Sequence, residues 1–120
     1  MNDRFEKLEV WKKAHAFTLS VYKLTKSFPS EEKYSLVDQL KRSASSVPTN
    51  IVEGNERNSN KEFIQFAFTA KASLAESKYQ LLLAKDLGFV SDTDYKNILG
   101  LANEIGKMLN GLISYLKSVS

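Results

Sequence analysis

The chain has 120 residues, which is the size of one domain and is long enough to bury a hydrophobic core without disulfides or metal ions. Hydrophobic residues make up 42% of it and charged residues 26%, which excludes a disordered chain, while five glycines and two prolines leave too few turns for an all-β fold. The 17 lysines and arginines only slightly exceed the 14 aspartates and glutamates, so the charge alone does not indicate nucleic-acid binding, although a symmetric oligomer would multiply each basic patch.

The first helix is predicted from Leu8 to Ser27. Its apolar residues recur at spacings of four and three, which places them on one face; they are Val10, Ala14, Phe17, Val21 and Leu24. Phe28 precedes Pro29, and because the residue before a proline is pushed out of helical geometry, the helix should end there.

The second helix is predicted to start with Ser30 as its N-cap and two glutamates in the first turn, where the helix dipole favours acids. Its apolar face consists of Leu36, Leu40, Ala44, Val47 and Ile51. This pattern passes through Pro48 without losing its phase, which favours a kinked helix over a break at Val47. The hydroxyl groups that could satisfy the disturbed backbone are those of Ser45, Ser46 and Thr49.

The third helix opens at Ser59, which has the spacing of a capping box with Glu62, and Gly88 is a natural C-terminal stop. One apolar face holds a heptad rhythm through Phe63, Ala67, Ala70, Leu74, Ser77, Leu81 and Ala84. A second apolar stripe on another side comprises Phe68, Ala72, Ala75, Tyr79 and Leu82. A helix that is apolar on two sides needs two partners, and the second partner could be another subunit.

The fourth helix is predicted to begin after Ser91, its N-cap, with Asp92 and Asp94 in the first turn. Its apolar positions are Ile98, Ala102, Ile105, Leu109, Leu112, Leu116 and Val119. The connections are short, so consecutive helices should be antiparallel. The prediction is therefore an all-α fold, an antiparallel up-down-up-down four-helix bundle with its second helix kinked at Pro48, in a single domain spanning residues 1–120.

A polar stripe follows the second helix beside its apolar face. We call it the polar seam; its members, at spacings of three, four, four, three and four, are Gln39, Arg42, Ser46, Asn50, Glu53 and Arg57. Glu53 and Arg57 also have the favourable order for an i,i+4 ion pair. Three interpretations stay open: a solvated face, a hydrogen-bonded network that fixes register at a helix or subunit contact, and a substrate-positioning site using Arg42 and Glu53. No nucleophile–base set accompanies these residues.

Several segments carry a resemblance to a known family. The most specific are Phe28-Pro29 with Glu32, Gln39 with Arg42, residues 46–54 with Pro48 and Asn50, Ser73-Leu74 with Glu76, and "LEVWKKA" at residues 8–14. In these segments the chain resembles the four-helix bundle family of 23S rRNA intervening-sequence proteins over nearly its whole length. It departs at Val47 and Val52, where that family more often has isoleucine and alanine; both changes keep the apolar character.

The resemblance implies a bundle that assembles as a ring-like homopentamer, in a family with no established catalytic activity. It also implies a family some of whose members are encoded within an insertion in a ribosomal RNA gene. The accessory variability protein of diversity-generating retroelements is similar to the same family, and that relative partners a reverse transcriptase and nucleic acid. With this resemblance, the assembly interpretation of the polar seam is favoured over the solvated face.

Lysines recur every seven residues on the third helix, at Lys71, Lys78 and Lys85, so they form one basic edge, and Lys61 lies at the start of the same helix. Around a ring such edges would make a basic belt suited to phosphate backbones, with weak sequence selectivity because no base-reading motif is present. The alternative is that these are ordinary solubilising lysines, diluted by acidic neighbours.

The remaining features indicate no catalysis and no cofactor. Cysteine is absent, and His15, the only histidine, has no ligand partners at helical spacing, so no metal site is expected. The charged N-terminus has no leader-like apolar block, and no run approaches the ~20 residues of a membrane span, so we expect a cytoplasmic protein without a membrane partner.

The leading hypothesis is a non-enzymatic oligomeric scaffold or adaptor with RNA or DNA as a candidate ligand. The alternatives are a structural partner of another protein, and an enzyme with its site at a subunit crevice.

Overall fold

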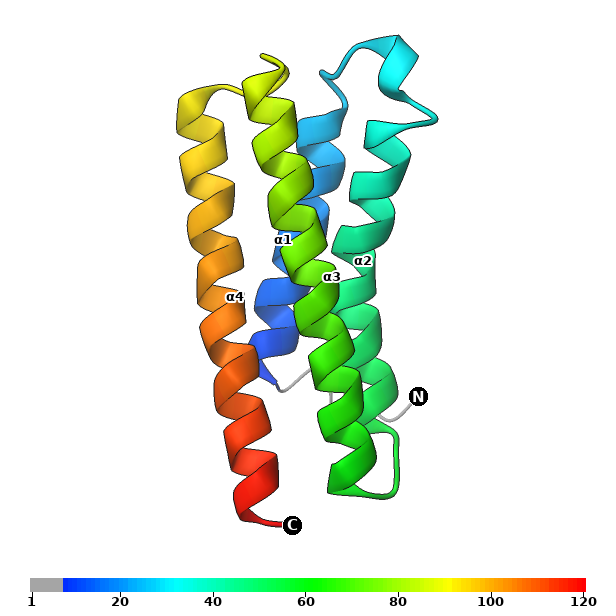
Figure 1. The fold of residues 1–120 in the computed structure, drawn as a ribbon, viewed down its shortest axis with the longest axis vertical. Helices are drawn as coiled ribbons and strands as arrows, with labels where there is room; N and C mark the ends of the chain where they lie inside the picture. Colours follow the sequence, from blue (N-terminus) through cyan, green and yellow to red (C-terminus); the bar gives the residue numbers. More distant parts are fainter. Residues whose placement is uncertain (1–7) are drawn as a thin grey trace.

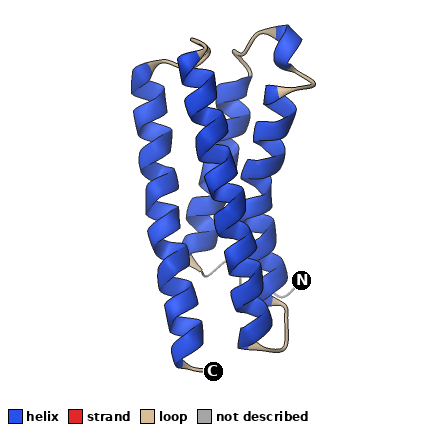
Figure 2. Ribbon diagram, viewed as in Figure 1, coloured by secondary structure: helices blue, strands red, loops and turns tan. Residues whose placement is uncertain are grey.

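A computed structural model describes residues 8–120 and gives an elongated bundle measuring 46 × 25 × 20 Å. The elements are α1 (Glu9–Thr25), a 3-10 helix η2 (Ser30–Glu32), α2 (Leu36–Asn55), α3 (Asn60–Asp86) and α4 (Asp92–Ser118). In Figure 1 the chain runs up α1, down α2, up α3 and down α4. The prediction of an all-α four-helix fold is confirmed, and Figure 2 shows helices and loops but no strand in the described part.

The core follows the apolar periodicity of the four helices. Its largest fully buried aliphatic and aromatic side chains include Phe17, Leu40, Ile51, Leu81, Ile105 and Leu109. All five predicted core residues of α2 are buried. Within residues 8–120, no helix has the combined length and apolar character that a membrane crossing requires.

The start of the second helix was predicted wrongly. Ser30 begins only a 3-10 turn, and α2 starts at Leu36. No side chain between residues 30 and 35 is buried, whereas Leu36 is 6% exposed. Because helical stability in proteins comes mainly from packing an apolar face, the segment before Leu36 has little to hold it in an α-helix.

The end of the fourth helix also differs from the prediction. Ile113 is buried, Leu112 is only half-buried, and Val119 is 51% exposed. The core face passes from Leu109 through Ile113 to Leu116, so two spacings of four follow Ile105 where the prediction had four and then three. Adjacent apolar residues at positions 112 and 113 made the two registers indistinguishable in the sequence.

The predicted N-terminal caps of α3 and α4 and the predicted C-terminal stop of α3 are confirmed. The Ser59 hydroxyl accepts the Glu62 amide at 3.2 Å, and the Ser91 hydroxyl accepts the Asp94 amide at 3.1 Å. Gly88 has a φ of +83°, the left-handed conformation that favours glycine after a helix. These caps fix where the α2–α3 and α3–α4 connections turn.

Candidate functional site

α2 and α3 lie close together because small residues separate them. A Cβ on Gly54 would lie 2.6 Å from Cδ1 of Phe63 and 2.9 Å from Cβ of Phe66, so only glycine fits there without movement. Farther along the same contact, Ser43 and Ser77 are buried against each other. Short side chains along this line let polar groups on α2 meet polar groups on α3 directly.

A buried polar cluster connects the two helices. The hydroxyl oxygens of Ser43 and Ser77 are 2.8 Å apart, and the Ser43 hydroxyl also lies 2.7 Å from the Oε1 acceptor of Gln80. The Gln80 amide donates to the Glu76 carboxylate at 3.2 Å. Sequence reasoning missed this cluster as a polar feature; its one signal was a serine, Ser77, in the predicted core face of the third helix. The bonded arrangement fixes the register of α2 on α3.

The centre of the polar seam continues this network. The hydroxyl groups of Ser46 and Ser73 are 2.8 Å apart across the helix contact, and the Asn50 amide donates to the Ser46 hydroxyl at 2.9 Å and to its carbonyl at 2.8 Å. The Ser73 carbonyl accepts the Ser77 hydroxyl at 3.1 Å, which joins the two groups. Ser46 and Asn50 therefore belong to an interhelical network.

The two ends of the polar seam lie on the surface of the chain. Gln39, Arg42, Glu53 and Arg57 are exposed. Arg42 pairs with Asp38 on the same helix, and the Arg57 guanidinium lies 4.7 Å from the centre of the Phe66 ring. The ion pair expected between Glu53 and Arg57 does not form. Stacking on an aromatic face holds the Arg57 guanidinium on the α3 side instead.

α2 is continuous through Pro48, so the alternative of a break at Val47 is wrong; the kink itself stays a prediction. Pro48 has no amide proton for the carbonyl four residues earlier, that of Ala44. The hydroxyl of Thr18 on α1 lies 3.1 Å from this carbonyl and 3.0 Å from that of Ala14. We expected a hydroxyl of α2 itself, but the substitute donor comes from the neighbouring helix.

The four candidate nucleic-acid lysines do not share one environment. Lys71 and Lys78 are half-buried and line a common cleft between α3 and α4. The Lys85 ammonium lies 4.0 Å from the Asp86 carboxylate and 5.3 Å from the centre of the Tyr95 ring. Lys61 is exposed at the beginning of α3. The predicted basic edge is thus divided, with its two central lysines forming the cleft.

The second apolar stripe of α3 faces outward. We call it the α3 outer stripe; it consists of Phe68, Ala72, Ala75, Tyr79 and Leu82, all of which are exposed. Phe68 is 45% exposed and Tyr79 is 63% exposed, and the ammonium groups of Lys71 and Lys117 lie 5.5 and 5.6 Å from the Phe68 ring centre. No charged residue belongs to the stripe, which covers about 21 Å of helix.

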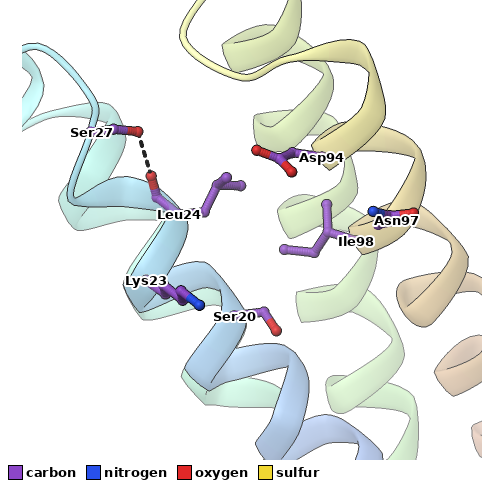
Figure 3. Close-up of a pocket in the computed structure, with 7 residues that line it drawn as sticks. All are labelled: Ser20, Lys23, Leu24, Ser27, Asp94, Asn97 and Ile98. Carbon is purple, nitrogen blue, oxygen red and sulfur yellow. Dashed lines mark hydrogen bonds between the residues drawn. The ribbon is translucent and has the colours of Figure 1, made fainter.

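A cleft of about 400 Å³ lies between α1 and α4 (Figure 3), and neither a residue of the polar seam nor one of the four candidate lysines lines it. Its lining residues are Ser20, Lys23, Leu24, Ser27, Asp94, Asn97 and Ile98. The Leu24 and Ile98 side chains form an apolar floor, and the Ser27 hydroxyl is bonded to the Leu24 carbonyl at 3.1 Å. Among the described residues, neither serine hydroxyl of this cleft is hydrogen-bonded to the Asp94 carboxylate.

His15 stacks on Trp11 with ring centroids 5.1 Å apart and an interplanar angle of 5°. Among the described residues, no three histidine, aspartate or glutamate side chains gather in a group that could hold a metal ion.

The fold and the α2–α3 contact define the class: a small all-α bundle whose central helices are joined by a polar network. The family model of the 23S rRNA-intervening sequence protein matches residues 6–111, and the chain belongs to this family. A crystal structure of a protein of unknown function, from the S23 ribosomal protein family of Bacteroides thetaiotaomicron VPI-5482, is similar with a TM-score of 0.81. That protein is 28% identical, and the match covers 87% of this chain and 97% of that one. The chain matches none of the curated proteins with which it was compared.

Proposed function

We propose that this chain is a non-enzymatic scaffold or adaptor that assembles with copies of itself, as a ring-like homopentamer, and binds RNA or DNA with weak sequence selectivity. The observation that carries the proposal is the α3 outer stripe, an exposed apolar face on the side of α3 away from the core. The ring and its size are what the family resemblance implies.

The α3 outer stripe supports self-association because exposed apolar residues are gathered along one helix. Scattered apolar side chains on a protein surface need no explanation, but a contiguous group commonly marks an interaction site. Tyr79 and Leu82 are 63% and 38% exposed. Covering their apolar area in an interface would stabilise the assembly by about 25 cal/mol for each Å² that is removed from water. A second copy of the chain is the partner that the family resemblance favours.

The exposed ends of the polar seam supply groups for such an interface. Within residues 8–120, the carboxylate of Glu53 has no hydrogen-bond or ion-pair partner, and neither has the side-chain amide of Gln39. In the same part of the chain, Arg42 pairs only with Asp38, one turn away on its own helix. In our proposal these groups meet a neighbouring copy and set its register, whereas Ser46 and Asn50 hold α2 on α3.

Nucleic-acid binding is supported by the position of the unpaired lysines. Lys71 and Lys78 have no carboxylate within ion-pair distance among the described residues, and Lys61 is exposed and equally unpaired. Repeated around an assembly, they would form a basic belt whose affinity for phosphate backbones falls steeply with salt.

We propose that the chain is not an enzyme because of how Arg42, Asn50 and Glu53 are arranged. Arg42 faces Asp38, Asn50 is bonded to Ser46, and Glu53 is exposed to solvent. Among the described residues, no hydrogen bond or ion pair joins these three side chains to one another.

Sedimentation velocity on two matched variants tests the self-association. Tyr79→Glu places a charge in the middle of the α3 outer stripe, whereas Tyr34→Glu places the same charge on a tyrosine that is 86% exposed in the α1–α2 connection. We expect Tyr34→Glu to assemble like wild type and Tyr79→Glu to dissociate, both with unchanged helical circular dichroism. Unchanged assembly of Tyr79→Glu would refute the stripe as the interface.

A further inference from the structure

The cleft between α3 and α4 has a volume of about 190 Å³. It is lined by Lys71, Leu74, Ala75 and Lys78 from α3 and by Gly106 and Asn110 from α4. The lining therefore combines the apolar side chains of Leu74 and Ala75 with two lysine ammonium groups and the Asn110 carboxamide. Among residues 8–120, no carboxylate lines the cleft.

In the described part of the chain, the two lysines at this cleft are half-buried without the acidic partner that three other lysines have. Lys12 pairs with Glu9 at 3.2 Å, Lys13 pairs with Glu104 at 3.3 Å, and Lys85 lies 4.0 Å from Asp86. Lys71 and Lys78 are half-buried, yet within residues 8–120 neither has an acidic partner. Partial desolvation strengthens the attraction of such unpaired charges for an anion.

The space in the cleft depends in part on Gly106. A Cβ at this position would lie 3.7 Å from Cδ2 of Leu74, which is an ordinary van der Waals contact. Packing inside the chain therefore does not demand a glycine here, and glycine costs about 1 kcal/mol of helix propensity relative to alanine. What the glycine does provide is room beside the two ammonium groups.

From this geometry we infer that the α3–α4 cleft binds a phosphate group. The Lys71 ammonium lies 5.5 Å from the centre of the Phe68 ring, so it has to turn into the cleft to join Lys78 and the Asn110 amide in donating to one phosphate. A phosphate offers these three donors more oxygens and more negative charge than a carboxylate does. Resting on the proposed nucleic-acid binding, the phosphate is one of a nucleic-acid backbone; a free phosphate compound shares the chemistry and is separated from it by the experiment below.

The first arm of the experiment removes the charges. Binding of a fluorescent single-stranded RNA to the full chain is measured by anisotropy as the salt concentration is varied. The double variant Lys71→Gln/Lys78→Gln should bind at least tenfold more weakly at low salt. Its log–log salt slope should fall by about 0.7 for each occupied cleft, since the two lysines hold one phosphate and each lost phosphate contact on a single strand contributes about 0.7.

The matched control removes the same charge from outside the cleft. Lys96 and Lys107 are exposed on α4 and do not line the cleft, so Lys96→Gln/Lys107→Gln should change the affinity much less. Equal losses in the two double variants would overturn the cleft and leave only diffuse electrostatic attraction. Sedimentation of each variant checks that its assembly is intact.

The second arm fills the cleft without changing any charge. Gly106→Ala adds a methyl group at the floor, and Gly100→Ala adds one on the same helix where a Cβ meets nothing within 4 Å. Both variants should melt at a higher temperature, because alanine is the better helix former. Only Gly106→Ala should weaken binding, by about threefold, and RNA affinity equal to that of wild type would count against the cleft.

The third arm separates the two sources of phosphate by using inorganic pyrophosphate as a second probe. If wild type binds RNA but both double variants lose it equally, the proposed nucleic-acid function stands and the cleft fails. If pyrophosphate binds in a Lys78-dependent way while RNA does not bind, the cleft stands as a site for free phosphate compounds and nucleic-acid binding fails. Binding of neither probe overturns both.

Discussion

The replacement of Thr18 by valine tests how α2 stays helical through Pro48. The Thr18 hydroxyl lies 3.1 Å from the Ala44 carbonyl, which has lost its usual donor because residue 48 is proline. Ala44 is fully buried, so water cannot easily replace the hydroxyl. An unsatisfied buried acceptor costs about 1–3 kcal/mol. The same hydroxyl also lies 3.0 Å from the Ala14 carbonyl, and its one proton can serve only one of the two carbonyls at a time. The expected loss of stability is therefore at the lower end of this range, about 1–2 kcal/mol.

Urea denaturation followed by circular dichroism measures this loss, and a double-mutant cycle with Pro48→Ala identifies its cause. Alanine at position 48 restores an amide donor four residues after Ala44, so Thr18→Val should then cost about 1 kcal/mol less than in wild type. Thr49→Val is the control, because Thr49 is exposed and its hydroxyl donates to the Ser45 carbonyl, which keeps its helical donor. If Thr18→Val lowers the free energy of unfolding equally with proline and with alanine at position 48, the Thr18 hydroxyl does not replace the amide donor that Pro48 lacks.

Two further predictions concern the α2–α3 contact, and a third concerns the exposed end of the polar seam. Gly54→Ala should destabilise the fold by about 1–3 kcal/mol, because the added Cβ would lie 2.6 Å from Phe63; an unchanged urea midpoint would contradict the close approach. Ser77→Ala should cost about 1 kcal/mol by thermal melting, since it leaves the buried Ser43 with one partner fewer, and a neutral result would show that the polar cluster adds no net stability. Arg42→Ala should change the melting of a dissociated chain by less than about 0.5 kcal/mol but weaken assembly in sedimentation, because its pairing within the chain is exposed; no change in assembly would place Arg42 outside the interface.

The periodic parts of the fold were predictable because each helix repeats its apolar residues in one phase. The core of α2 illustrates this, because its apolar residues recur at spacings of four and three and so all lie on the one face that is buried. The end of α4 was not predictable, because apolar residues at 112 and 113 fit two registers and only packing against the other helices selected Ile113. The prediction of where α2 starts failed for a related reason. The capping signal at Ser30 was local, and no buried residue followed it before Leu36.

The candidate site was predictable in kind but not in its partners. A polar stripe beside an apolar one indicated hydrogen bonding at Ser46 and Asn50, and both are bonded in the structure. Which residue of α3 faces Ser46 depends on the register between two helices, which a single sequence does not reveal. The Thr18 donor was hidden for the same reason, because it acts on a carbonyl 26 positions away in the chain.

The mass of the wild-type particle, measured by native mass spectrometry at micromolar concentration and moderate salt, bears most directly on the proposal that the chain assembles with copies of itself. The proposal predicts a single species of about five times the 13.5 kDa of one chain, with Tyr79→Glu moving toward the single-chain mass. A wild-type protein found only at 13.5 kDa under these conditions would contradict it.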